Sequence, residues 1–410
     1  MPVCFYIICD IMEQYIRRNQ KLLRYGITTG TCAAAAAKAA AAKLLLGIYQ
    51  DEITVNTPKG ISVSIPVRMV METDCSAEYM VIKDSGDDPD VTNQAEIHVC
   101  VKKLSKPEQR LGEEKSITGD TVFSDKRYPG LFLDGGVGVG RVTKAGLEQR
   151  IGQAAINTVP RSMIFDAVGE VCNLAEYGGE LLIMVSVPKG EELAERTFNP
   201  RLGICGGISI LGTSGILEPM SERAIVDTIE TEIRQLHVQG VKNLLVTPGN
   251  YGQSYAADYL HLDMEKSIKC SNYIGDTLDL AVSYGMERFL LVGNIGKLVK
   301  LAAGIMNTHS KTADARSEIF AVHTVLCGGS RKMAETLMDC INTEEMLRHL
   351  EEWSLRELVI QSICRKIEEH IGHRIGSEMK AGVILFSETL GYLGETQETG
   401  GIVKEFLKPI

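Results

Sequence analysis

An alanine-rich stretch near the start of the chain constrains the fold more than any other feature. Residues 24–43 read RYGITTGTCAAAAAKAAAAK, and nine of the ten residues from 33 to 42 are alanine. Alanine has the highest helix propensity and a very small side chain, so a helix of this composition can lie very close to a sheet or to a second helix. We therefore expect a tightly packed helix here.

The threonines before this helix suit two roles. Thr28, Thr29 and Thr31 are candidate N-caps, and the free amides of a first helical turn, with the helix dipole, attract an anion. One interpretation is an anion-binding helix start, and an equally favoured one is a well-capped buried helix without a ligand. A helix start can also lower the pKa of the Cys32 thiol, although burial of Cys32 is the simpler expectation.

Length, charge and cysteine usage limit the class of protein. The 410 residues exceed one ordinary hydrophobic core, which predicts two or three domains. The net charge of −10 argues against broad binding to nucleic acid or anionic lipid, because both need a dominant basic surface, but local Arg and Lys still permit an anionic small molecule. The eleven cysteines include no CxxC pair, so we expect free thiols in a reducing cytoplasm, without a disulfide framework or a zinc site.

Residues 1–23 form an expected N-terminal extension. Their apolar patch from Val3 to Met12 is interrupted by Asp10 and follows no basic residue, so it matches neither a signal peptide nor a membrane span. We expect a short additional helix or strand, or translation from an upstream start codon. Later segments do not approach a membrane span either, which favours a cytoplasmic protein.

Two styles of sequence predict two domains. Alternating stretches such as ITVNTPKGISVSIPV predict half-buried strands, and with the alanine-rich helix they indicate an α+β domain with a mixed sheet over residues 24–205. Later, VKNLLVTPGN and ERFLLVGNIGKLVKLAAGIM each show a strand followed by a glycine turn. Strands alternating with helices indicate an α/β domain over residues 206–410, with a Rossmann-like, mainly parallel sheet that binds ligands beyond the carboxyl ends of its strands.

The segment KDSGDDPD, residues 83–90, places several carboxylates in one turn. A calcium-binding EF-hand would need glycine and glutamate where this chain has Pro89 and Ala95, so that interpretation fails. A solvated turn is the simpler explanation. The functional alternative is a general base or an acceptor for a substrate N–H, which requires burial to raise a carboxylate pKa. The candidates are Asp84, Asp87 and Asp88.

Glycine-rich stretches fail as nucleotide fingerprints. LDGGVGVGRVTKAGL lacks the spacing of a dinucleotide site, and GNIGK lacks that of a P-loop. The first still allows close backbone approach, with Arg141 and Lys144 as carboxylate ligands. TPGNYG, residues 247–252, lies after a strand and before a helix, where a parallel sheet binds its ligand. His309 is more simply structural than catalytic, and the cysteines suggest no catalytic triad.

Eight motifs, in this order along the chain, resemble those of one family. The cobalt-precorrin-5B C1-methyltransferase family (CbiD type) of cobalamin biosynthesis has motifs similar to GITTGTCAAAAAKAA, KDSGDDPDVTN, DGGVGVGRVTKAGL, QAAINTVPRSMI, NPRLGICGGISILGTSGILEPMS, TPGNYG, SNYIGD and GNIGKLVKLAAGIMNTHSKTADAR. The resemblance runs from about Arg24 to the C terminus. The chain departs from the family pattern in two places. The first twenty or so residues precede the usual start of the family, and Asn294 stands where the family commonly has His; if that His is catalytic, Asn294 puts activity in doubt.

The resemblance implies transfer of a methyl group from S-adenosylmethionine to C1 of a cobalt-containing corrinoid, giving cobalt-precorrin-6A. Such an in-line displacement needs two aligned ligands and no protein nucleophile, which agrees with the missing triad. Cobalt would arrive within the substrate, so no protein metal site is expected. We expect the donor in the C-terminal domain at Thr247, Gly249, Asn250, Gly252, Gly293, Asn294 and Lys297.

The corrinoid would lie between the domains, against the first helix and the Asp84–Asp90 turn. Its carboxylates require local donors, for which the candidates are Thr28, Thr29, Thr31, Arg141, Lys144, Arg161, Arg201, His309 and Arg316. If the threonines bind carboxylates, valine at Thr29 or Thr31 weakens corrinoid binding more than donor binding.

Two other functions remain open at this point. A non-catalytic tetrapyrrole carrier would share the anion-binding features but need no donor site. Phosphate or nucleotide transfer is disfavoured by the failed fingerprints. Self-association and transient contact with other enzymes of the pathway are compatible with the sequence, which does not decide them.

Overall fold

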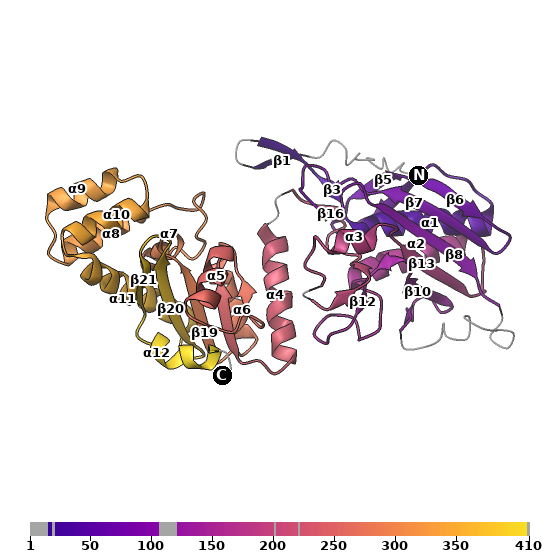
Figure 1. The fold of residues 1–410 in the computed structure, drawn as a ribbon. Coiled ribbons are helices and arrows are strands. Elements are labelled where there is room, and N and C mark those ends of the chain that lie inside the picture. Colours follow the sequence, from indigo (N-terminus) through magenta and orange to yellow (C-terminus); the bar gives the residue numbers. More distant parts are fainter. Residues whose placement is uncertain (1–14, 19–20, 106–120, 201, 220–221, 408–410) are drawn as a thin grey trace. The chain divides into compact units, whose positions relative to one another are not determined.

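The chain divides into two compact units between Ser221 and Glu222, and each is described by itself. This computed structural model describes residues 15–18, 21–105, 121–200, 202–219 and 222–407 (Figure 1). The division falls later than the boundary expected after Cys205. The reason is strand pairing after Cys205: β15 (Gly207–Ile208) pairs with β11 (Gly138–Val139), and β16 (Ile216–Leu217) pairs with β3 (Gly26–Ile27). Just before them, β14 (Ile204–Cys205) pairs with β12 (Arg141–Val142).

A six-stranded mixed sheet forms the centre of the first unit. Its strands follow the order β6 (Arg68–Glu72), β7 (Ser76–Ile82), β8 (Glu96–Lys103), β13 (Leu181–Ser186), β10 (Leu131–Gly135) and β9 (Phe123–Ser124). The β13–β10 pair is parallel, and the other neighbours are antiparallel. The expected α+β character with a mixed sheet is therefore present in this unit.

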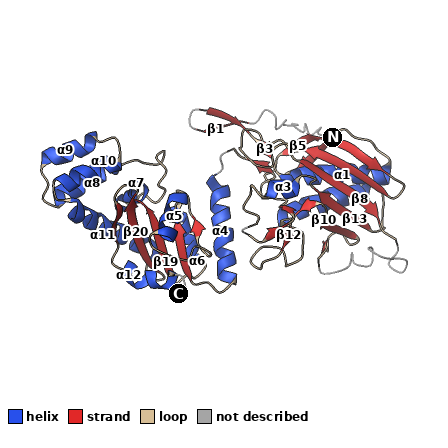
Figure 2. Cartoon of the chain, in the orientation of Figure 1, coloured by secondary structure: helices blue, strands red, loops and turns tan. Residues whose placement is uncertain are grey.

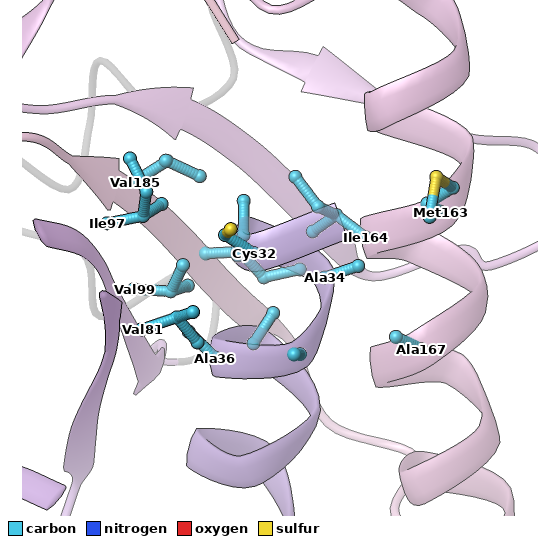
Figure 3. Close-up of a cluster of buried hydrophobic side chains, with 14 of the residues drawn as sticks. Cys32, Ala34, Ala36, Val81, Ile97, Val99, Met163, Ile164, Ala167 and Val185 are labelled. Carbon is cyan, nitrogen blue, oxygen red and sulfur yellow. The ribbon is translucent and has the colours of Figure 1, made fainter. Parts of the chain in front are cut away.

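The alanine-rich segment forms helix α1 (Thr29–Leu46), which packs against β7, β8 and helix α2 (Thr158–Leu174). Its nine alanines are at most 5% exposed. Figure 3 shows Cys32 and Ala36 beside sheet residues and Ala34 beside Ile164 of α2. Because alanine adds only a methyl group, the helix fits between two layers that larger side chains would separate. The tightly packed helix expected from the sequence is confirmed.

Smaller elements complete the first unit. They are β1 (Tyr15–Arg18) paired with β2 (Lys21–Arg24), β4 (Glu52–Asn56) paired with β5 (Ser62–Pro66), β11 (Gly138–Val139) paired with β15 (Gly207–Ile208), and α3 (Gly190–Ala194). Part of the extension expected over residues 1–23 thus lies in the β1–β2 pair. Residues 1–14 and 19–20 lie outside the described residues.

The second unit has a five-stranded sheet with helices on both faces (Figure 2). The strand order is β18 (Ile268–Lys269), β17 (Asn243–Thr247), β19 (Arg288–Asn294), β20 (Lys380–Ser387) and β21 (Gly391–Glu395); the first four are parallel and β21 is antiparallel. Successive residues of a strand point to opposite faces. Accordingly, Leu244 and Val246 enter one core and Leu245 enters the other.

Two sets of helices cover these faces. The core with Leu245 includes residues of α5 (Asn250–Asp258), α12 (Thr399–Ile402) and the 3-10 helix η5 (Val403–Phe406). The opposite core includes residues of α4 (Glu222–Val238), α6 (Ile274–Ser283), α7 (Ile295–Leu298), the 3-10 helix η4 (Val299–Ala303), α8 (Arg316–Leu326), α9 (Arg331–Asp339), α10 (Thr343–Glu352) and α11 (Arg356–Ile375). Within the described ranges, no helix has both the length and the apolarity that a bilayer crossing requires.

Candidate functional site

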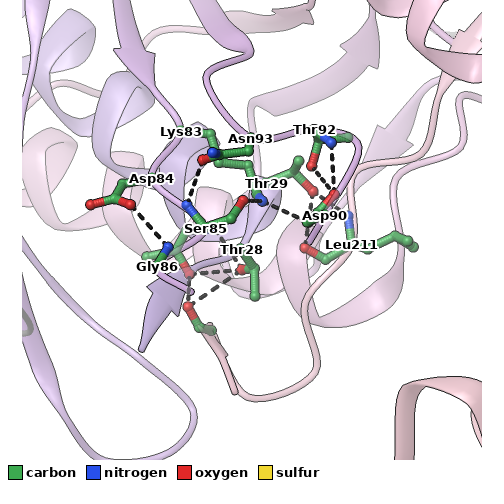
Figure 4. A network of polar contacts seen from close by, with 12 residues as sticks. Thr28, Thr29, Lys83, Asp84, Ser85, Gly86, Asp90, Thr92, Asn93 and Leu211 are labelled. Atoms are coloured by element: carbon green, nitrogen blue, oxygen red, sulfur yellow. Dashed lines mark hydrogen bonds and ion pairs between the residues drawn. The ribbon is translucent and has the colours of Figure 1, made fainter. Parts of the chain in front are cut away.

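The threonines at the start of α1 bind the chain itself (Figure 4). The Thr28 hydroxyl caps the helix by accepting from the Thr31 backbone N–H at 3.2 Å. The Thr31 hydroxyl donates to the Gly215 carbonyl at 2.6 Å, and the Thr29 hydroxyl accepts from the Leu211 N–H at 2.8 Å. All three threonines are buried. In this structure their hydroxyls are therefore occupied as a buried helix cap and are not free to donate to substrate carboxylates.

Cys32 is fully buried beside this cap. Burial raises the pKa of its thiol to about 12, and the positive charge of Lys83 opposes that shift only partly. The alternative of a lowered pKa at the helix start is therefore wrong, because desolvation of the thiolate outweighs the nearby lysine and the backbone hydrogen bond.

The aspartate-rich turn is tied to Arg24. The guanidinium of Arg24 donates to both carboxylate oxygens of Asp84, at 2.7 and 2.8 Å, and the Arg24 backbone N–H donates to Asp87 at 2.6 Å. The hydrogen bonds from Arg24 hold the pKa of Asp84 below its usual value, against the effect of burial. A general base here was expected to need a raised pKa. Asp84 does not meet that condition, because an opposite charge favours its ionised form.

Sequence reasoning missed a buried ion pair in the same turn. Lys83 is 1% exposed, and its ammonium donates to the Ser85 hydroxyl at 2.6 Å and to Asp90 at 2.7 Å. Burial alone would raise the pKa of Asp90, but the charge and hydrogen bond of Lys83 and two bonds from Thr92 bring it below its usual value. A lysine before a run of aspartates looks like a solvated charge, so the local sequence does not predict that Lys83 is buried.

The glycines of DGGVGVG approach the protein's own backbone. A Cβ at Gly138, where φ is +71°, would lie 1.8 Å from the Val187 carbonyl oxygen. The close approach predicted for this stretch is therefore explained by contact with the segment after β13. Arg141 donates to Asp134 at 2.7 Å and to the Gly135 carbonyl at 2.6 Å, so much of its guanidinium is already bound. Lys144 is exposed in a neighbouring turn.

Arg161 retains an unused donor. Its guanidinium lies 4.4 Å from the centre of the Phe123 ring, and one terminal nitrogen donates to Thr158 at 2.6 Å. Its Nε atom is buried and has no hydrogen-bond partner among the described residues. Burial lowers the pKa of Arg161. A buried donor without a partner is costly, so this atom is suited to an anionic ligand. Arg201, another predicted substrate ligand, lies outside the described residues.

The predicted donor residues meet at the carboxyl edge of the second sheet. Thr247 ends β17 and Asn294 ends β19, and these parallel strands are neighbours. After β17 the chain first forms β18 on one side of β17 and then β19 on its other side, so the strand order reverses at β17. Open α/β sheets bind ligands at such a reversal of strand order. Thr247 is fully buried, and its hydroxyl has no hydrogen-bond partner among the described residues.

Backbone packing shapes this edge. A Cβ at Gly252, in α5, would lie 2.8 Å from the Val292 carbonyl oxygen, so glycine lets the helix approach β19 closely. Gly293 packs against Leu298, whereas Gly249 is extended and has open space beside it. The Asn294 side chain caps the short helix α7 by accepting from the Gly296 N–H at 2.7 Å.

Basic side chains lie along the same edge. Lys269, which sequence reasoning missed, ends β18 and donates to the Asn250 side chain at 2.7 Å. Burial raises the pKa of the Cys270 thiol to about 12, and the positive charge of nearby Lys297 opposes this rise. Lys269 follows a two-residue strand, too short to produce a recognisable pattern.

The segment 305–315 joins this edge through residues that follow β18. The Thr308 N–H donates to the Asn272 carbonyl at 3.0 Å. Buried Lys300 donates to the carbonyls of Thr308 and Ala313 at 3.1 and 2.9 Å, and burial lowers its pKa. These bonds fix the segment that carries His309.

His309 and Arg316 are themselves held locally. The His309 Nδ1 atom accepts from the Lys311 N–H at 3.1 Å, and Arg316 donates to Asp314 at 2.8 Å. Both belong to the second unit, whereas the other described substrate candidates belong to the first. The structure therefore does not bring the predicted substrate ligands together within one unit.

An acidic group closes the other end of the edge. Ser387, which ends β20, donates to Glu344 at 2.7 Å, and Thr389 also binds this carboxylate. Glu344 lies in the first turn of α10. In the sequence it looks like one charge among many on an amphipathic helix, so its position at the edge could not be predicted.

Comparisons with known proteins agree over most of the chain. The family described as CbiD matches residues 16–219, and that described as CbiD, C-terminal domain, matches residues 307–397. A cobalt-precorrin-5B C(1)-methyltransferase of Ruminiclostridium cellulolyticum is 45% identical over 92% of each chain. One of Alkaliphilus metalliredigens is 39% identical over 97% of this chain and 98% of the relative.

One similar solved structure is described as the 1.9 Å crystal structure of a cobalamin biosynthesis protein (cbiD) from Archaeoglobus fulgidus. It is 28% identical and covers 74% of this chain and 87% of its own, with a TM-score of 0.38. That superposition is too loose to support a structural argument.

Proposed function

The chain belongs to the CbiD family, and we propose from this membership that it is a cobalt-precorrin-5B C(1)-methyltransferase of cobalamin biosynthesis. The observation that carries the proposal is the similarity, over nearly the whole chain, to curated enzymes of that name. The reaction moves a methyl group from S-adenosylmethionine to C1 of cobalt-precorrin-5B and yields cobalt-precorrin-6A. Cobalt enters as part of the substrate.

The methyl donor is assigned to the carboxyl edge of the Rossmann-like second sheet. Three features support this site: the reversal of strand order beside Thr247, the buried unpartnered hydroxyl of Thr247, and the open space beside Gly249. The donor's amino-acid carboxylate is matched by Lys269 and Lys297. Glu344 supplies an acceptor of the kind that binds ribose hydroxyls.

The corrinoid carries several carboxylates, so a protein of net charge −10 must bind it through local donors. Arg161 supports this role with its unpartnered Nε, and Lys144 adds an exposed charge. Arg201, His309 and Arg316 stay part of this proposal as further predicted ligands. Transfer to carbon requires the protein to align the two ligands and exclude water rather than to supply a nucleophile.

The carboxylates of the turn can be tested as proton acceptors. Asp84, Asp87 and Asp88 are each replaced by Asn, and methyl transfer is followed in a single turnover. We expect Asp84→Asn to act mainly through the loss of the Arg24 pair. Unchanged rates for all three variants would mean that none of these carboxylates takes part in the chemistry.

Donor binding distinguishes the enzyme from a non-catalytic carrier. Calorimetric titration with S-adenosylhomocysteine, with and without corrinoid, should show a single donor site. Gly249→Ala should weaken this binding without changing the urea unfolding midpoint, because the added methyl meets no protein atom and the extended backbone accepts alanine. Gly178→Ala, at another non-helical glycine in open space, is the matched control. No donor binding under either condition would favour the carrier.

A cytoplasmic location is part of the same proposal. Every cysteine in the described part of the chain is a free thiol, which suits a reducing compartment. Self-association and contacts with other pathway enzymes remain predictions.

A further inference from the structure

Three different metal-ligating side chains meet at the turn between α9 and α10. Cys340 follows the last residue of α9, and Glu345 and His349 lie one turn apart on α10. One ligand atom from each, a thiol sulfur, a carboxylate oxygen and an imidazole nitrogen, lies within 4.8 Å of the other two. All three residues are partly buried. Proximity of a thiol, a carboxylate and an imidazole distinguishes this cluster from an ordinary group of surface acids.

We propose that Cys340, Glu345 and His349 bind a divalent transition-metal ion of the zinc type, with water as a fourth ligand. Zinc takes sulfur at about 2.3 Å and nitrogen or oxygen at about 2.0 Å in a tetrahedron, which places neighbouring ligand atoms about 3.5 Å apart. In the structure the ligand atoms lie within 4.8 Å of one another. Side-chain rotations that move these atoms by the order of 1 Å bring them to the spacing that zinc requires. The site uses none of the residues assigned to the donor edge, although Glu345 directly follows Glu344, and it does not depend on the methyltransferase proposal.

Local hydrogen bonds hold the backbone and the ligands in place. The Asn342 side chain accepts from the Glu345 N–H at 2.9 Å, and one Glu345 oxygen accepts from the Ile341 N–H at 2.9 Å. The cap thus fixes the carboxylate and leaves its second oxygen available. Residues four apart on a helix lie on the same face, which brings Glu345 and His349 together.

The histidine has the surroundings of a metal ligand. Its Nδ1 atom lies 3.3 Å from a carboxylate oxygen of Glu352, and its ring stacks on Trp353 with a centroid distance of 5.5 Å. Metal-bound histidines usually donate their other ring N–H to a carboxylate, which fixes the tautomer and orients the ring. Glu352 supplies that carboxylate when Nδ1 carries the proton, and Nε2 is then the nitrogen left for the metal.

The charges around the thiol favour a cation. The carboxylates of Glu345 and Asp339 lie near the Cys340 thiol, and the positive charge of Arg348 offsets them only in part. When a divalent ion binds, the thiol loses its proton to solvent, a sulfur–metal bond forms, and the ion compensates the thiolate and carboxylate. The absence of any CxxC pair led to the expectation of no metal site, but these ligands follow no such spacing.

Co²⁺ titration of the full-length, reduced and metal-stripped protein tests the proposal. Four-coordinate Co²⁺ bound to a thiolate gives a near-ultraviolet charge-transfer band and strong visible bands. We expect both to saturate at one equivalent and to vanish when Zn²⁺ is added. Cys340→Ser should remove the charge-transfer band. Glu345→Gln keeps an acceptor for the Ile341 N–H and should weaken Co²⁺ binding about tenfold or more.

Cys327→Ser is the matched control, because Cys327 is a free thiol of the same helical region outside the cluster. It should bind Co²⁺ like the wild type. Circular dichroism establishes that each variant is folded, and His349→Gln provides a second test if Cys340→Ser is not. A wild-type protein without the bands, or bands that persist in Cys340→Ser and His349→Gln, would overturn the proposal and leave Glu345 as a helix cap only.

Discussion

At the residue scale, polar side chains near the start of α1 bind other parts of the chain rather than solvent. The Thr31 hydroxyl reaches Gly215, and the Lys83 ammonium is enclosed by Ser85 and Asp90. Burying such groups is tolerable only when each has a partner, and removing one partner leaves the other unsatisfied. These contacts therefore have consequences for stability that can be measured separately from ligand binding.

Thr31→Val should destabilise the protein. Valine has nearly the same shape as threonine but cannot donate to the buried Gly215 carbonyl, which costs about 1–3 kcal/mol. Urea unfolding followed by circular dichroism measures the loss. Thr54→Val, at an exposed site on β4, is the control and should change the midpoint little. A normal midpoint together with selective loss of corrinoid binding would support the carboxylate-binding role instead.

Asp84→Asn should change the acid dependence of stability. The pairing with Arg24 lowers the pKa of Asp84 in the folded state, so its contribution is present above the ordinary value of about 4 and is lost as pH falls through the lower folded value. The variant should be less stable than the wild type at pH 7 and should lose less stability on acidification. Urea midpoints over a pH series measure this.

Asp74→Asn, at an exposed carboxylate of the first unit, is the control for this series. If Asp84→Asn shows the same decline below about pH 4 as the wild type, the ion pair with Arg24 does not contribute to acid stability.

At the element scale, the small side chains of α1 decide how the first unit packs. The helix lies against β4, β7, β8 and α2, and its alanines fill the space that remains. At the carboxyl edge of the second sheet, Gly252 has a comparable role, because α5 approaches β19 too closely for a Cβ. In both places a small residue sets the distance between two elements.

Ala36→Leu should destabilise the first unit by about 1–3 kcal/mol, because a fully buried position would have to accept three more carbon atoms. The midpoint of urea unfolding, followed by circular dichroism, measures the effect. Lys38→Leu places the same side chain on a half-buried position of the same helix and should cost less. Equal costs at the two positions would show that close packing of the alanines is not what limits this helix.

At the scale of the whole molecule, two units carry separate hydrophobic cores. The main core of the first unit is built from residues between Ile27 and Ile216. The two cores of the second unit are built from residues between Ile229 and Phe406. The only tryptophan, Trp353, packs against a core of the second unit. Its fluorescence therefore reports on the unit to which the methyl donor is assigned.

S-adenosylhomocysteine should raise the urea midpoint seen by Trp353 fluorescence. A ligand that binds only the folded state stabilises it, by about 2.7 kcal/mol at a concentration one hundred times its dissociation constant. The Gly249→Ala variant should need more ligand for the same shift. A ligand-induced shift that appears by circular dichroism but not in Trp353 fluorescence would place the donor in the first unit.

The sequence by itself determined what depends on near neighbours. Helix propensity and capping residues predict α1, and strands followed by glycine turns predict the parallel second sheet, because these signals act within a few residues. The ordered motifs also identified the family, through resemblance rather than through physical reasoning.

Only the tertiary structure decided which polar groups are free. Thr31 meets Gly215 across 184 positions of the chain, and Arg24 meets Asp84 across 60. Whether a hydroxyl or carboxylate faces a ligand or another part of the protein depends on such long-range contacts, which leave no periodic pattern in the sequence. Because they depend on such contacts, the buried position of Lys83 and the place of Glu344 at the sheet edge could not be predicted from the sequence. Among the predicted site residues, Arg161 and Thr247 have buried polar atoms that lack a partner among the described residues.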